Sequence, residues 1–136
     1  GGMLSARIIN ISGSSAVFSS GLVTYSNEAK QQLLQIPHAL IASVGAVSPE
    51  VAKAMASRVR ELAGTDYGIG ITGIAGPDGG TAEKPVGLVY IAIADKNGVK
   101  SSKNLYTGSR YDVRYRSTQT ALAMLRTALL SAKAEG

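Results

Sequence analysis

Residues 86–107, VGLVYIAIADKNGVKSSKNLYT, contain the strongest β-strand pattern in the sequence. An apolar run over residues 88–94 is followed by a Lys-Asn-Gly turn at residues 96–98 and then by a second extended run. Two extended runs joined by so short a turn are typical of a β-hairpin. The stretch therefore predicts two adjacent antiparallel strands, around which the rest of the fold is organised.

The segment before this hairpin predicts one more strand and a helix. DYGIGITGI, residues 66–74, has the pattern of a buried strand with glycines where another element packs closely. Ser48 and Pro49 are typical of a helix start, and Gly64 is typical of a helix end. The inward face expected for this helix consists of Val51, Met55, Val59 and Leu62.

Both ends of the chain are predicted to be helical. Leu4, Ile8 and Ile11 recur at helical spacing near the start. A second helix is expected from about residue 111 to about residue 133. The residues expected to face inward on that helix are Val113, Ala121, Met124, Leu125, Ala128 and Leu129.

The remaining segments complete a layered domain. Residues 13–25 have a strand-like pattern, Asn27 is the expected N-cap of a short helix, and residues 35–47 are expected to form a connector. Strands that alternate with helices predict an α/β fold. We therefore expect a single domain over residues 1–136, with a mixed β-sheet flanked by helices.

The composition excludes several classes of site. The chain has no cysteine and one histidine, His38, so disulfides, thiolate zinc sites, cysteine nucleophiles and histidine metal clusters are excluded. His38 is expected to be a surface or packing residue. No apolar run reaches the roughly 20 residues that span a bilayer, and no signal-peptide pattern opens the chain. We expect a cytoplasmic protein with no membrane partner and no metal.

The net charge of +5 leaves two interpretations open. The basic residues either form a solvated face or bind an anionic ligand. No nucleic-acid-binding motif accompanies them, and the aromatic residues are too scattered for a stacking platform. The basic residues of the last third of the chain are Lys96, Lys100, Lys103, Arg110, Arg114 and Arg116.

A glycine-rich stretch is the first candidate site. TGIAGPDGGTAEKPVG, residues 72–87, follows the end of a predicted strand, where α/β sheets bind ligands. Backbone amides in such turns can converge on an anion or an oxyanion. Thr72 and Gly73 stand at the strand exit, and Lys84 could reach a phosphate or carboxylate. The alternative is a purely structural turn.

Two further stretches carry chemistry. VTYSNEAK, residues 23–30, places the phenol of Tyr25 near the amine of Lys30 at the start of a helix. A partly buried Lys30 would have a lowered pKa and could act as a general base. GSRYDVR places Arg110 and Arg114 one helical turn apart, and two arginines so placed could form an anion-binding site. The alternatives are a capped surface helix with an exposed lysine, and solvated arginines.

Together these stretches resemble one family. GSSAVFSSGLVTYSNEAK, GAVSPEVAKAMA, ITGIAGPDGGTAEKPVGLVYIAI and the GSRYDVR helix are similar, in order, to the C-terminal domain of the competence/damage-inducible protein CinA. The resemblance covers essentially the whole chain. It implies a nicotinamide mononucleotide deamidase, which releases ammonia and nicotinate mononucleotide through a serine nucleophile and a lysine base, without a cofactor or metal.

The resemblance also implies roles for individual residues. Lys30 and Tyr25 match the lysine and tyrosine of the family, and Thr72 matches the threonine of its catalytic pocket. Arg114, or else Arg110, would bind the phosphate or ribose side of the substrate. Ser109 stands where the family has aspartate. The further residues expected to bind substrate are Gly1, Gly2, Gly73, Gly76, Gly79, Gly80 and Lys84.

The nucleophile is the point at which the sequence departs from the family. The nucleophilic serine of the family lies in the motif ESCTGG. Gly1 and Gly2 of this chain match the last two residues of that motif. The resemblance therefore places the serine, and a strand before it, just upstream of Gly1. None of Ser19, Ser20 and Ser26 has a match to the family's nucleophile. Two alternatives to the deamidase function are a non-catalytic module that binds pyridine nucleotides and a nucleic-acid-binding protein. The protein is expected to form homo-oligomers.

Overall fold

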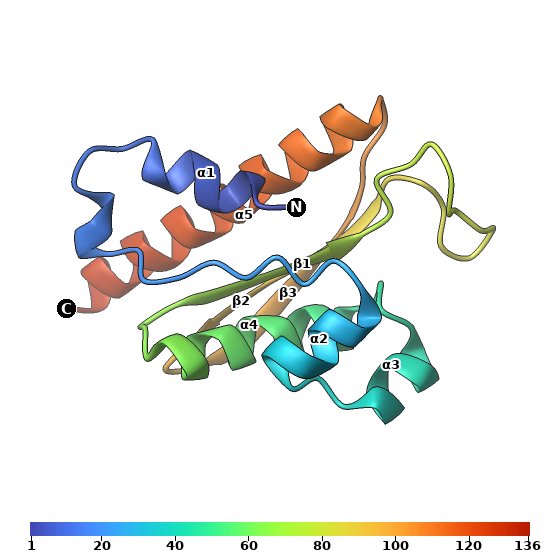
Figure 1. The fold of residues 1–136 in the computed structure, drawn as a ribbon. Coiled ribbons are helices and arrows are strands. Elements are labelled where there is room, and N and C mark those ends of the chain that lie inside the picture. The colour runs from blue at the N-terminus through green and yellow to red at the C-terminus, as the bar shows by residue number, and fades with distance from the viewer.

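The computed structural model describes residues 1–136 as a three-layered α/β arrangement (Figure 1). A three-stranded sheet lies between helices on its two faces. The elements in chain order are α1 (Met3–Ile9), the 3-10 turn η1 (Ser14–Ala16), α2 (Asn27–Leu34), α3 (His38–Val44), α4 (Pro49–Ala63), β1 (Gly68–Gly73), β2 (Leu88–Asp95), β3 (Gly98–Leu105) and α5 (Arg110–Glu135).

The sheet confirms the hairpin but not the mixed topology. Strands β2 and β3 pair antiparallel, with Asp95 opposite Gly98 across the expected turn. Strand β1 also pairs antiparallel with β2, so the order is β1-β2-β3 with no parallel pair. The expectation of a mixed sheet was wrong because the segment between β1 and β2 contains no helix. A parallel connection needs a crossover that such a loop does not supply.

Helix α4 packs closely on one face of the sheet. Ala52 and Ala56 are fully buried against β2. A Cβ atom on Gly70 would lie 2.4 Å from the backbone oxygen of Ala52, so the glycines of β1 are what allow this approach. Val51 and Met55 are buried as expected, but they pack against the α2–α3 side. Leu62 was expected to face inward and is 50% exposed.

Helices α1 and α5 form the layer on the other face. Val113 and Ala121 of α5 are buried against Val89 and Ile91 of β2. Leu129, expected to face inward, is 48% exposed. Figure 1 shows α1 lying along α5 on this side. No helix is both long and apolar enough to cross a membrane.

Three local predictions need correction. Residues 13–25 contain the short turn η1 and then an extended stretch that pairs with no strand. The expected connector contains helix α3, which begins at His38, and that histidine is exposed. The N-cap of α2 is Ser26 rather than Asn27, because the Ser26 hydroxyl accepts a hydrogen bond from the Ala29 amide.

Candidate active site

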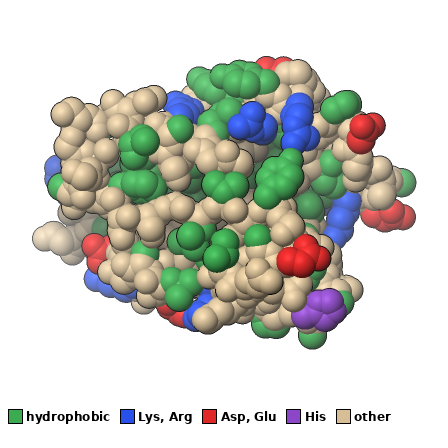
Figure 2. All heavy atoms as spheres, viewed as in Figure 1, with side chains coloured by type: hydrophobic (Ala, Val, Ile, Leu, Met, Phe, Trp, Pro, Cys, Tyr) green, Lys and Arg blue, Asp and Glu red, His purple; other side chains and the backbone are tan.

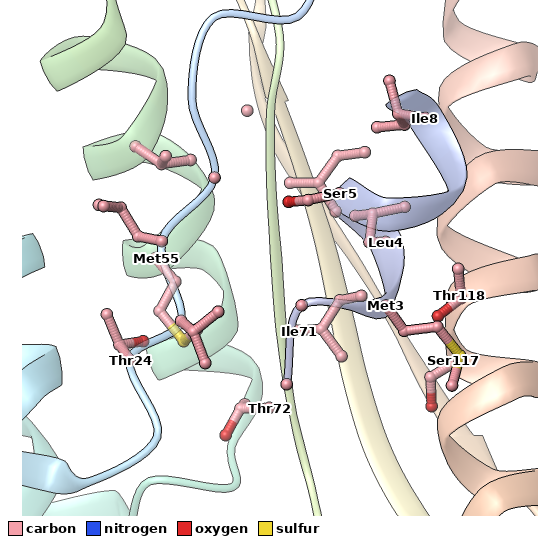
Figure 3. A pocket seen from close by; sticks show the side chains of 18 of the residues that line it. Met3, Leu4, Ser5, Ile8, Thr24, Met55, Ile71, Thr72, Ser117 and Thr118 are labelled. Atoms are coloured by element: carbon pink, nitrogen blue, oxygen red, sulfur yellow. The ribbon is translucent and has the colours of Figure 1, made fainter. Parts of the chain in front are cut away.

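A long groove runs beside β1. It has a volume of about 1520 Å³. The free edge of β1 lines one side, and the extended residues 17–25 line the other. Its walls come from both helical layers: Figure 3 shows Leu4 and Met3 of α1 on one side of β1, and Met55 of α4 on the other. The groove therefore opens along an unpaired strand edge inside the layered core.

Lys30 of α2 is a buried amine in this groove. Its side chain is 7% exposed, and its Nζ donates a hydrogen bond of 2.8 Å to the backbone carbonyl of Thr24. Burial lowers the pKa of the Lys30 amine below its ordinary value. A neutral Lys30 could keep this hydrogen bond and offer its lone pair to a hydroxyl. The condition set for a lysine base is thus met at this position.

Thr72 and Lys84 both donate to backbone carbonyls at the end of α3 or just after it. The Thr72 hydroxyl lies at the end of β1 and donates a 2.8 Å hydrogen bond to the Ala46 carbonyl. Lys84 Nζ donates a 2.7 Å hydrogen bond to the Val44 carbonyl at the end of α3. Thr72 lines the groove, whereas Lys84 does not. Lys84 therefore fastens the glycine-rich stretch to α3 in this structure.

Tyr25 and Arg110 meet at one end of the groove. Arg110 Nη2 donates a 2.7 Å hydrogen bond to the Tyr25 hydroxyl, and Nη1 donates a 2.8 Å hydrogen bond to the Gly76 carbonyl. Tyr25 is 74% exposed, so its phenol lies at the mouth of the groove and not in the core. The structure thus brings together three predicted site residues, Tyr25, Gly76 and Arg110.

The guanidinium of Arg114 has no hydrogen-bond partner in the structure. It lines the groove one helical turn beyond Arg110, and its Nη2 lies 3.8 Å from where a Cβ of Gly1 would stand. The groove is also lined by Lys30 and Arg110, so three cationic side chains lie along its wall. Figure 2 shows Lys and Arg side chains beside exposed hydrophobic ones on this face.

Ser109 caps α5. Its hydroxyl accepts from the Asp112 amide, and the Asp112 carboxylate accepts from the Ser109 amide and hydroxyl. These hydrogen bonds, the backbone one first, lower the pKa of the Asp112 carboxyl. The cap fixes the start of α5 and so the position from which both arginines extend.

The glycines of residues 72–87 are divided between lining the groove and packing. Gly73, Gly76 and Gly79 line the groove, and Gly1 and Gly2 lie there too. Gly80 is outside the lining, and a Cβ there would lie 2.6 Å from the Val86 amide nitrogen. Gly80 is therefore placed as a packing glycine in this structure.

Sequence reasoning missed hydroxyls on the α5 side of the groove. Ser117 and Thr118 line it and are buried, and each donates its hydroxyl to a backbone carbonyl one turn earlier, those of Val113 and Arg114 (Figure 3). A signal existed: Ser117 interrupts the stripe formed by Val113 and Ala121. The side chains include no group of three His, Asp or Glu that could hold a metal ion.

The arrangement suits acyl chemistry on an anionic molecule. A buried amine can take a proton from a hydroxyl nucleophile, and the positive charge near Gly1 can hold an anionic group of the substrate. No serine side chain in the structure hydrogen-bonds to Lys30, whose hydrogen bond goes to Thr24. Ser26 is engaged as the cap of α2.

Comparisons with known proteins give consistent matches. A family model described as the CinA C-terminal domain matches residues 1–129. The chain is 54% identical over 133 residues to a CinA-like protein of Geobacter sp. (strain M21), which covers 98% of the chain and 32% of that protein. It is 51% identical over 132 residues to a CinA-like protein of Geobacter sulfurreducens, covering 97% of the chain and 32% of that protein. The chain spans about a third of the length of these curated relatives.

Solved structures share the fold. The competence/damage inducible protein CihA from Agrobacterium tumefaciens superposes with a TM-score of 0.91 at 40% identity, covering 93% of this chain and 78% of that one. A CinA superfamily protein from Klebsiella pneumoniae 700603 superposes with a TM-score of 0.92 at 32% identity, covering 96% of this chain and 82% of that one. The chain is therefore similar to CinA-family proteins in both sequence and fold.

Proposed function

The chain belongs to the CinA C-terminal domain family of competence/damage-inducible proteins, and from this premise we propose that it is an amidohydrolase. Its proposed substrate is nicotinamide mononucleotide. Water cleaves the carboxamide to give nicotinate mononucleotide and ammonia. The observation that carries the proposal is the buried amine of Lys30, whose pKa is lowered, in the groove that the unpaired guanidinium of Arg114 also lines.

Lys30 acts in this mechanism as the general base. Its neutral amine takes the proton of a serine hydroxyl as the serine oxygen attacks the carboxamide carbon. The proton then passes to the departing ammonia, and water hydrolyses the resulting ester. Tyr25 serves as a proton relay at the mouth of the groove, and Thr72 shapes the pocket wall. The mechanism uses no metal ion and no cofactor.

The groove supports a serine that is supplied from upstream of Gly1. The outer edge of β1 has no strand partner, and apolar residues from both helical layers line the space beside it. A β-strand presents side chains to both faces and needs an edge to pair with, so such a groove suits one. We place there the residues that precede Gly1, with the nucleophile at the groove end near Lys30.

Backbone amides complete the proposed site. The tetrahedral intermediate carries an oxyanion, which preorganised N–H groups stabilise. The glycines that line the groove, Gly1 and Gly2 before α1 and Gly73, Gly76 and Gly79 after β1, are the proposed donors and substrate contacts. Gly80 and Lys84 take no direct part in this scheme, because both lie outside the groove lining.

Ammonia release from the nucleotide tests the proposal. Full-length protein, with the residues that precede Gly1, is incubated with nicotinamide mononucleotide, and ammonia and nicotinate mononucleotide are measured together. We expect equal amounts of both products, and no loss of rate on addition of a chelator. Calorimetric binding of the nucleotide without ammonia release would instead support a non-catalytic binding module.

Replacement of Arg114 by alanine should weaken substrate binding. A hydrogen bond to a charged group contributes about 1.5–3 kcal/mol, so KM should rise by about 10- to 100-fold with kcat largely kept. Steady-state ammonia release measures both constants. The matched control is Arg116→Ala, which removes an exposed arginine of the same helix that does not line the groove. An unchanged KM for the Arg114 variant would contradict the role.

A further inference from the structure

Arg110 joins two segments that are far apart in the sequence. Its guanidinium donates one hydrogen bond to the Gly76 carbonyl in the glycine-rich stretch and another to the Tyr25 hydroxyl before α2. We call this pair of hydrogen bonds the Arg110 bridge. All three residues line the same groove. The bridge therefore links the end of β1 to the segment on the opposite side of the groove.

The extended segment has few other attachments. Residues 19–25 make no backbone–backbone hydrogen bond. Two hydrogen bonds hold them to the rest of the protein: Lys30 donates to the Thr24 carbonyl, and Arg110 donates to the Tyr25 hydroxyl. Because Tyr25 is 74% exposed, little packing holds its ring in place. The position of the phenol thus depends on Arg110.

The two arginines of α5 that line the groove, Arg110 and Arg114, differ in their contacts. Both terminal nitrogens of the Arg110 guanidinium donate to protein oxygens, whereas the guanidinium of Arg114 has no hydrogen-bond partner. Only a planar guanidinium can donate in two directions from one side chain with this geometry, and a lysine ammonium is a single point charge. Because the Arg110 guanidinium already donates to two protein oxygens, it is better suited to linking these segments than to binding an anion.

We infer that Arg110 is a positioning residue, which holds Tyr25 and the glycine-rich stretch at a fixed separation across the end of the groove. Arg110 thereby also sets the orientation of Tyr25 toward the reacting group, and this consequence rests on the proposed function. Arg114 is then the arginine that meets the anionic part of the substrate. Loss of the bridge loosens the extended segment and displaces the phenol, and leaves the anion contact in place.

Limited proteolysis tests the link without reference to activity. We compare the full-length protein with its Arg110→Ala and Arg110→Lys variants, using a broad-specificity protease and mapping the cuts by mass spectrometry. Cleavage within residues 19–25 should be about tenfold faster in both variants, as expected when a hydrogen bond from a charged group is lost. Arg126→Ala, an exposed arginine of α5 outside the groove, is the matched control and should cleave as wild type.

Tyr25→Phe shows whether the effect passes through the bridge. The variant keeps the ring and removes the hydroxyl that Arg110 binds. It should accelerate the same cleavages, and the double variant Arg110→Ala/Tyr25→Phe should be no faster than Arg110→Ala alone. Unchanged cleavage in the Arg110 variants, or fully additive effects in the double variant, would overturn the inference.

Kinetics separate positioning from binding. With nicotinamide mononucleotide, Arg110→Ala should lower kcat and change KM little, and Arg110→Lys should not restore kcat. A raised KM with unchanged kcat would make Arg110 the anion ligand and overturn the inference. If the wild-type protein releases no ammonia, the proposed function fails, and the proteolysis results still decide on the bridge.

Discussion

Replacement of Lys30 by alanine is expected to lower the turnover of nicotinamide mononucleotide by about 10²- to 10⁴-fold, the range for loss of a general base. The reason is that Lys30 is the buried amine of the groove, held by the Thr24 carbonyl, with a pKa lowered by burial. Ammonia release under single-turnover conditions measures the effect. Nucleotide binding, followed by calorimetry, should stay near the wild-type value.

Two companion variants define what Lys30 does. Lys30→Arg keeps a donor for the Thr24 carbonyl but cannot lose its proton near neutral pH, so it should be as inactive as the alanine variant. Lys53→Ala removes an exposed lysine of α4 and should be fully active. Wild-type turnover in either Lys30 variant would refute the general-base role.

The pH dependence of the wild-type enzyme follows from the same amine. A lysine base works in its neutral form, whose fraction rises as pH rises through the pKa. Because burial lowers the pKa of Lys30, this rise in kcat/KM should come below the usual range for lysine. A pH–rate profile that rises only near the ordinary lysine pKa would contradict a base whose pKa is lowered by burial.

The fold was predictable where its signals are local. The turn at residues 96–98 and the caps Ser48 and Gly64 carry their own sequence signals, and the structure confirms the elements that they define. Residues 19–25 have a strand-like pattern but form no strand, because strand formation also needs a partner edge. That requirement is non-local, and no feature of the segment itself reports it.

The contacts of the candidate site were less predictable than its residues. Lys84 is predicted to reach a phosphate or carboxylate, and in this structure it donates to the Val44 carbonyl. Arg110 donates to the Gly76 carbonyl, and Thr72 donates to the Ala46 carbonyl. Every residue has a backbone carbonyl, so such partners leave no mark in the sequence. Lys30 also donates to a backbone carbonyl, that of Thr24, but its burial is the condition under which the sequence predicts a lysine base.

The glycine-rich stretch provides the largest expected effect on stability. Gly87 has φ +92°, and a Cβ there would lie 1.9 Å from the Tyr106 carbonyl oxygen. Its amide donates to the Ile74 carbonyl at 2.7 Å, and its carbonyl accepts from the Tyr106 amide at 2.9 Å. Gly87 therefore closes the connection between β1 and β2 against the end of β3, where no side chain fits.

Gly79 supplies a control with the same backbone conformation. Its φ is also +92°, but the nearest atom to an added Cβ is Ile74 Cγ2, at 3.8 Å. Gly79→Ala should therefore cost only the strain of a left-handed alanine, about 1–2 kcal/mol of unfolding free energy. Gly87→Ala carries this strain and must also displace the Tyr106 backbone, which adds about 1–3 kcal/mol. Urea unfolding measures the difference in unfolding free energy between the two variants, compared at the same dependence of that free energy on urea concentration. Equal losses in the two variants would mean that close packing against β3 does not hold this connection.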